Sequence, residues 1–149
     1  MKDEQGAPDE SSVNGENGWI HVGESQFRLF ASDTITARAR GTFTQDEART
    51  VFKTMLSWPR PENGFFYLSN VTHLVHQSQQ VTSEAKKLPR RFFRAVAIVG
   101  ASFRHRVLIE TMLRASRYFK IDIVPAPTRY FETEEQAFEW FERIRRGEE

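Results

Sequence analysis

The stretch GFFYLSNVTHL, Gly64–Leu74, decides the fold of this 149-residue chain. Its first part, up to Val71, is an almost continuous apolar run. Such runs are typical of a strand that is buried on both faces of a sheet. We therefore predict a buried strand over Gly64–Val71. The polar stretch Ser69–Ser83 overlaps the end of this run, and we interpret it as a loop, where binding residues often lie.

Upstream of this strand, the sequence predicts three more strands and one helix. Apolar and polar residues alternate over Ile35–Phe43, which predicts a half-buried strand. Thr44 and Glu47 have the spacing of a capping box, so a helix is expected to begin there. It should end at Trp58–Pro61, because proline cannot continue a helix. Two shorter strands are predicted from a set of apolar residues: Ile20, Val22, Phe27, Leu29 and Phe30.

Downstream of the central strand, strands and amphipathic helices alternate. The last helix is expected to begin at a second capping-box pair, Thr133 and Gln136. The other predicted elements are a helix from about Thr82, a strand at Ala95–Val99, a helix after Gly100–Ser102, and a strand at either Ile121–Val124 or Thr128–Phe131.

This order of elements predicts an α/β fold with parallel strand pairs. We expect a single domain over residues 18–147, with a mixed central sheet of about five strands and helices packed mainly on one face. Residues 1–17 are polar and acidic, and we expect them to form a disordered tail. The chain has no cysteine, which excludes disulfides and thiolate chemistry, and its first residues lack the pattern of a secretory signal. We therefore expect a cytoplasmic protein.

Charge is distributed unevenly along the chain. Residues 82–120 hold ten basic and two acidic side chains, whereas residues 1–16 hold one basic and five acidic ones. A basic segment of this kind predicts a partner with an acidic surface. Phe92 and Phe93 lie within it, a pattern also compatible with single-stranded nucleic acid or with peripheral contact to an anionic membrane. The modest pI, about 8.1, favours a protein partner, so no DNA is expected. The sequence leaves open whether the protein forms a homodimer.

Four local patterns occupy the same places in the order of elements as in a known family. They are a strand end that leads into a capped helix at Arg40–Glu47, LSNVTHL at Leu68–Leu74, VGAS at Val99–Ser102, and RYFETEEQAFEWF at Arg129–Phe141. Through them, residues 20–146 resemble the STAS-type domains of anti-sigma-factor antagonists in their broader SpoIIAA-like form, which is related to a small lipid-binding fold. The resemblance implies a non-enzymatic module that binds a protein or a small ligand.

The resemblance also implies a function for the polar stretch. In the family, an Asp-Ser-Ser-Gly pattern follows the strand and carries a serine that a partner kinase phosphorylates. Here that pattern falls on Val75–Ser78, so we expect the usual phosphoserine position to be lost. We predict an interaction module in bacterial regulation that binds a regulatory protein and needs no cofactor. The predicted partner-binding residues are His73, His76, Gln77, Ser78, Lys86, Lys87, Arg90 and Arg91.

A second hypothesis is a small-ligand binder, for a lipid in the core or for an anion. The predicted anion site combines amides at a helix start, Gly100 and Ser102, with Arg104 and Arg106. Catalytic and metal interpretations are weaker. His73 and His76 lack a third metal ligand nearby, the Ser83–Lys86 pair lacks the motifs that accompany a serine–lysine nucleophile, and Gly100–Arg104 lacks the second glycine of a nucleophile elbow.

Overall fold

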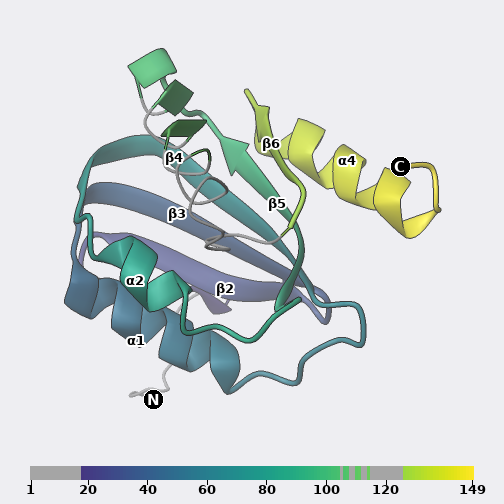
Figure 1. Ribbon diagram of the computed structural model, residues 1–149, viewed down its shortest axis with the longest axis horizontal. Coiled ribbons are helices and arrows are strands. Elements are labelled where there is room, and N and C mark those ends of the chain that lie inside the picture. The colour runs from purple at the N-terminus through teal and green to yellow at the C-terminus, as the bar shows by residue number, and fades with distance from the viewer. Residues whose placement is uncertain (1–17, 105, 108–109, 112–113, 115–125) are drawn as a thin grey trace.

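The computed structural model describes residues 18–104, 106–107, 110–111, 114 and 126–149. Six strands form one mixed sheet in the order β1-β2-β3-β4-β5-β6 (Figure 1). The first three are joined antiparallel, and β3 to β6 run parallel to one another. The strands are β1 (Ile20–Val22), β2 (Ser25–Ala31), β3 (Thr34–Phe43), β4 (Phe65–Gln77), β5 (Phe93–Val99) and β6 (Thr128–Phe131).

Successive side chains of β4 face opposite sides of the sheet, and each side is covered by helix. On one face, Phe65 packs with Met55 of α1 (Gln45–Leu56), and the short α2 (Val81–Ala85) lies beside α1. On the other face, Phe66 packs against α4 (Glu134–Arg145), where its ring lies 4.8 Å from that of Phe141. Burying a phenylalanine in this way contributes about 1.5–3 kcal/mol.

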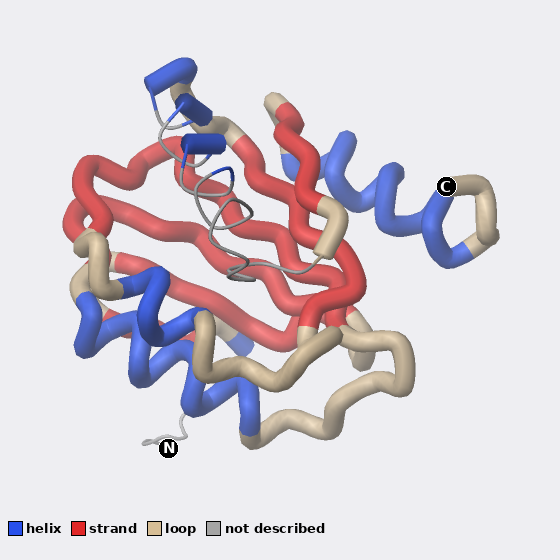
Figure 2. Tube along the Cα trace, in the orientation of Figure 1, coloured by secondary structure: helices blue, strands red, loops and turns tan. Residues whose placement is uncertain are grey.

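The predicted α/β fold class is confirmed, with six strands where we expected about five. The expectation that the helices pack mainly on one face agrees with two of the three described helices. Among the described helices, α1 and α2 cover one face while α4 covers the other (Figure 2). The reason is that Ala137, Trp140 and Phe141 form a complete apolar stripe that packs onto Leu68 and β5.

Both predicted capping boxes are confirmed. The Thr44 hydroxyl accepts from the Glu47 amide, and the Glu47 carboxylate accepts from the Thr44 amide. Thr133 and Gln136 make the same reciprocal pair of bonds at the start of α4. In each case two backbone N–H groups that the helix cannot satisfy itself gain acceptors.

One local expectation is wrong, and the structure decides between two alternatives for the last strand. The polar stretch after Val71 is not a loop from its beginning, because β4 continues to Gln77. It does so because β3 supplies a pairing partner as far as Phe43, opposite Gln77. Of the two candidate last strands, Thr128–Phe131 is β6. Three other expectations lie wholly or partly outside the described residues: the tail at 1–17, the strand at 121–124, and most of the helix after Gly100–Ser102.

No helix in the described part of the chain is both long and apolar enough to span a membrane.

Gly64 permits the close approach that starts β4. Its φ is +88°, and a Cβ built there would lie 2.5 Å from the Arg91 carbonyl oxygen. The next residue, Phe65, donates its N–H to the Phe92 carbonyl at 2.8 Å. A side chain at position 64 would therefore separate the beginnings of β4 and β5.

We expect Gly64→Ala to destabilise the protein by about 2 kcal/mol more than Gly147→Ala. Gly147 is a matched control, since its φ is +74° but a Cβ placed on it would meet nothing within 4 Å. Urea unfolding followed by circular dichroism measures both variants. Equal losses of unfolding free energy in the two variants would show that backbone strain alone, and not the contact with Arg91, restricts position 64.

Candidate functional site

Beyond the centre of the sheet, β3 and β4 continue as a two-stranded extension. We define this β3–β4 extension as Arg40–Phe43 and Thr72–Gln77. The pairing of β4 with β5 ends at Asn70, opposite Val99, whereas the pairing with β3 continues to Gln77. Past Asn70, the edge of β4 that faces away from β3 therefore has no strand partner within the described part of the chain. Figure 1 shows the two strands running on past the arrowhead of β5.

Four of the predicted partner-binding residues gather at this extension. His73, His76 and Gln77 are exposed on β4, and Ser78 follows at its end. Ser78 is the first residue after the strand; its N–H donates to the Phe43 carbonyl at 3.0 Å, and its side chain bonds Gln80. Sequence reasoning did not single out Val75, yet its side chain is 77% exposed in the middle of this polar set.

Two of the four predicted basic residues, Arg90 and Arg91, lie apart from the extension. Lys86 and Lys87 follow α2, and Arg90 and Arg91 precede β5, whose first residue pairs with Phe65. Phe65 is the first residue of β4, so Arg90 and Arg91 lie near the opposite end of that strand from Gln77. Twelve residues of strand span about 40 Å. The structure therefore separates Arg90 and Arg91 from the residues at the extension.

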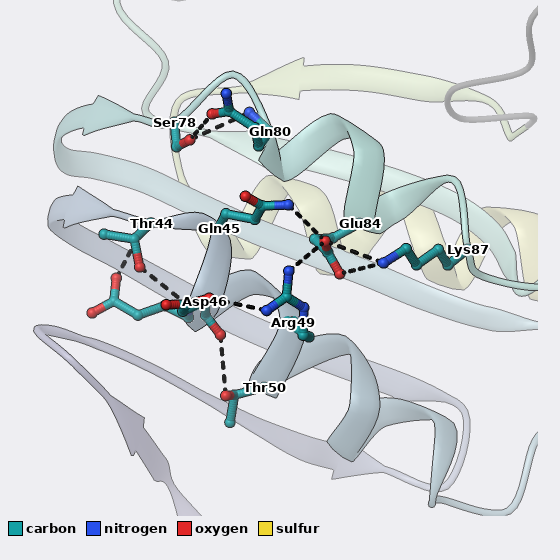
Figure 3. Close-up of polar contacts among 10 residues, drawn as sticks. Thr44, Gln45, Asp46, Arg49, Thr50, Ser78, Gln80, Glu84 and Lys87 are labelled. Atoms are coloured by element: carbon teal, nitrogen blue, oxygen red, sulfur yellow. Dashed lines mark hydrogen bonds and ion pairs between the residues drawn. The ribbon is translucent and has the colours of Figure 1, made fainter.

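A buried carboxylate fixes α2 onto α1. Glu84 is 3% exposed, although it belongs to a helix of only five residues. Its carboxylate accepts from Gln45 at 3.0 Å and from Arg49 and Lys87 at 3.3 Å each (Figure 3). These bonds, with that of Gln45 contributing most, hold the pKa of Glu84 below its ordinary value of 4.5. Lys87, predicted to bind a partner, thus forms an ion pair with α2 itself.

A polar cluster joins the strands to the start of α4. Glu134, the first residue of α4, accepts two hydrogen bonds from Arg38 at 3.1 Å and one from Asn70 at 2.8 Å. Burial opposes ionisation of Glu134, but these bonds hold its pKa below the ordinary value. The cluster borders a polar depression of about 300 Å³ that also reaches His73. Sequence spacing carried no signal for it, because its members are up to 96 positions apart.

An apolar hollow lies on the face of the sheet that α1 and α2 cover. Its volume is about 210 Å³. Tyr67, the third residue of β4, lines it, and burial raises the pKa of the Tyr67 hydroxyl against the effect of a hydrogen bond with Ser69. The apolar lining includes Phe43, Phe52, Val71, Phe93, Val96 and Ile98.

The predicted anion-binding residues lie after β5. Gly100 has a φ of +76°, and a Cβ there would meet the Thr72 hydroxyl at 2.0 Å. The Arg106 amide donates to the Ser102 carbonyl at 2.9 Å, as expected for a helix that starts at Ser102. Arg104 is exposed, but the Arg106 guanidinium lies over the Tyr130 ring, 5.2 Å from its centre. Arg106 is therefore already engaged by β6.

Within the described residues, no group of three or more His, Asp or Glu side chains is arranged to hold a metal ion.

The order of elements, the mixed sheet and the capped α4 define a STAS-type α/β domain. A family model described as SpoIIAA-like matches residues 34–142, so the chain belongs to the SpoIIAA-like family. No curated protein matches it.

Two solved structures show the same fold. One is an uncharacterized protein of the DUF3478 family with a SpoIIAA-like fold from Shewanella loihica PV-4, with 21% identity and a TM-score of 0.51 over 83% of this chain and 90% of that one. The other is the anti-sigma factor antagonist SpoIIAA in its unphosphorylated form, with 12% identity and a TM-score of 0.53 over 79% and 97%. Similarity at these identities shows the fold alone.

The Glu84 network predicts a particular dependence of stability on pH. A carboxylate whose pKa is lowered on folding stabilises the protein above its unfolded pKa, and this contribution is lost as the pH falls through the folded value. We expect Glu84→Gln to be less stable than wild type at neutral pH, and this difference in stability should narrow as the pH falls below the ordinary glutamate pKa of 4.5.

Urea midpoints measured across this range check the expectation. Asp46→Asn is the control, because Asp46 is 90% exposed and bonds the same Arg49. If the difference in urea midpoint between Glu84→Gln and wild type does not change with pH, the lowered pKa of Glu84 does not contribute to stability. If the difference for Asp46→Asn narrows equally, the effect does not belong to Glu84 in particular.

Proposed function

We propose that this chain is a non-enzymatic protein-interaction module that contacts a regulatory protein through the β3–β4 extension. The observation that carries the proposal is Val75, a large apolar side chain 77% exposed on a strand whose outer edge has no described partner. An exposed apolar side chain beside an open strand edge can pack against a segment that pairs with that edge. An open strand edge supplies backbone donors and acceptors for an incoming strand.

Several features support a binding role over a catalytic one. His73 and His76 are exposed and make no hydrogen bond to Ser78 or Ser83 within the described part of the chain. A histidine that activates a hydroxyl needs hydrogen-bond reach to it. The name of the structural relative SpoIIAA, an anti-sigma factor antagonist, describes a protein that acts on another protein. For this chain we propose the same general role, with Ser78 displaced from the family's phosphoserine position.

The basic residues after α2 form a second part of the proposed surface. Lys86 and Arg91 are exposed, and a partner with acidic groups would be attracted to them. Such rim charges chiefly raise the rate of association and weaken with salt. Because Arg90 and Arg91 lie near the far end of β4 from Gln77, we propose that they guide the partner rather than form the centre of the contact.

Crosslinking in cells tests the proposal. A photoreactive amino acid placed at His73 is expected to form one discrete adduct, and Val75→Glu is expected to reduce its yield at least about tenfold, because a charge would be buried. Leu56→Glu is the matched control, since Leu56 is also an exposed apolar residue but belongs to α1. If Val75→Glu leaves the yield of the crosslinked adduct unchanged, or if neither His73 nor His76 gives an adduct, the extension is not the contact surface.

A second candidate function rests on the apolar hollow. Its lining is largely aliphatic and aromatic, with the Tyr67 hydroxyl as a polar group at the wall, which suits an acyl chain or another slender apolar ligand. Ala37 borders the hollow and Ala31 is exposed on β2, so the two residues allow a matched pair of variants.

We expect the wild-type protein to bind a fluorescent fatty acid, and Ala37→Phe to weaken that binding at least about tenfold by filling the hollow. Ala31→Phe should bind as the wild type does. A fluorescence titration measures all three proteins. No binding by the wild type, together with a bare mass in native mass spectrometry of protein isolated from cells, would exclude this function.

A further inference from the structure

The chain beyond α4 turns back along the helix. Gly147, at a φ of +74°, donates its N–H to the Ile144 carbonyl at 3.0 Å, and Glu148 donates to the Arg143 carbonyl at 2.9 Å. These two bonds form a Schellman motif, which ends a helix and reverses the chain. Figure 1 shows the C-terminus returning beside the last turns of α4. Glu149 is thereby brought back onto the helix.

Three donors converge on the Glu149 carboxylate. One oxygen accepts from Arg129 at 3.1 Å and from the indole N–H of Trp140 at 3.0 Å. The other accepts from Arg143 at 2.7 Å. We call Arg129, Trp140 and Arg143 the carboxylate cradle. It joins β6 to α4 and offers two cations and a neutral donor.

The cradle is built into the fold rather than assembled from free surface side chains. Trp140 is 2% exposed, and a buried indole N–H needs an acceptor. The Arg129 guanidinium lies over the Phe131 and Trp140 rings, about 5.5 Å and 5.4 Å from their centres. Arg129 is thus positioned by aromatic contact, while Glu149 itself remains 32% exposed at its side chain. Trp140 is therefore fixed by the core and Arg129 by its two ring contacts, without help from Glu149.

Space for a longer ligand lies next to the cradle. Arg129 and Arg143 also line an open depression of about 400 Å³, together with Arg106 and Gln136. Glu132 and Glu139 are the acidic members of this lining, so arginines outnumber carboxylates. The depression runs beside β6, which is the last strand of the sheet among the described residues. An extended segment could therefore lie along this edge with an acidic side chain in the cradle.

We propose that the carboxylate cradle is a binding site for an acidic peptide segment of a partner protein, and that Glu149 occupies it as an internal competitor. Glu149 shows the chemistry of the ligand, since a carboxylate satisfies all three donors at once. The hydrogen bond from Arg143 contributes most to holding the pKa of Glu149 below its ordinary value, so the occupant stays ionised at neutral pH. A short tether gives an internal ligand a millimolar effective concentration.

This site is distinct from the proposed contact at the β3–β4 extension. It lies on β6 and α4, and it can be tested without knowledge of the partner. The probe is a fluorescently labelled octapeptide with four consecutive glutamates, and its control is the same peptide with four glutamines. Fluorescence anisotropy at low salt measures binding to the full chain and to three variants.

Glu149→Ala empties the cradle, and Glu148→Ala is the matched control, because it removes the same charge from a residue that pairs with Arg146 instead. We expect Glu149→Ala to bind the glutamate peptide at least about tenfold more tightly than wild type, and Glu148→Ala to stay within about twofold of wild type. The double variant Glu149→Ala/Arg143→Gln should lose this increase in affinity for the glutamate peptide.

If Glu149→Ala and Glu148→Ala increase the affinity for the glutamate peptide equally, the change in net charge alone explains the increase and the proposal is overturned. Equal binding of the glutamate and glutamine peptides would overturn it as well. If Glu149→Ala lowers the unfolding temperature but binds no peptide at concentrations up to about 1 mM, the contact only anchors the end of the chain, and the proposal fails.

Discussion

The structure depends on the burial of β4 from both sides. Phe65 and Phe66 are neighbours in the chain, yet they enter two different cores because side chains alternate across a strand. Each core is completed by a helix from a different part of the sequence, α1 on one face and α4 on the other. The sheet is the element that both helices share, so displacement of β4 would expose two cores at once.

Ionic contacts then fix how α4 lies on its face. Glu134 at its start bonds Arg38 and Asn70 of the sheet, and Arg145 at its end bonds Asp33 in the turn before β3. A helix joined to the sheet at both ends cannot slide along it. This placement puts Trp140 and Arg143 beside β6, and so creates the cradle that holds Glu149. The packing of α4 that closes the second core therefore also places two arginines and an indole N–H around one carboxylate.

The two proposed contact surfaces share one physical cause. A parallel sheet leaves open backbone wherever a strand ends earlier than its neighbour or has no neighbour. In the part of the chain that the structure describes, β4 continues beyond the end of β5 at the extension, and β6 is the outermost strand. At the first place an apolar side chain, Val75, is exposed, and at the second two arginines meet an acidic group. Each edge therefore suits a different chemistry of partner, one apolar and one anionic.

The sequence by itself determined the elements, because their signals are local. The alternation over β3, the apolar start of β4 and the capping boxes at Thr44 and Thr133 each depend on residues a few positions apart. Only the tertiary structure decided how long β4 is, since its polar end is a strand only where β3 pairs with it. It also decided that α4 covers the second face, that His73 and Arg91 lie far apart, and that Glu149 meets Arg129. Those contacts join residues distant in the chain, and no spacing pattern encodes them.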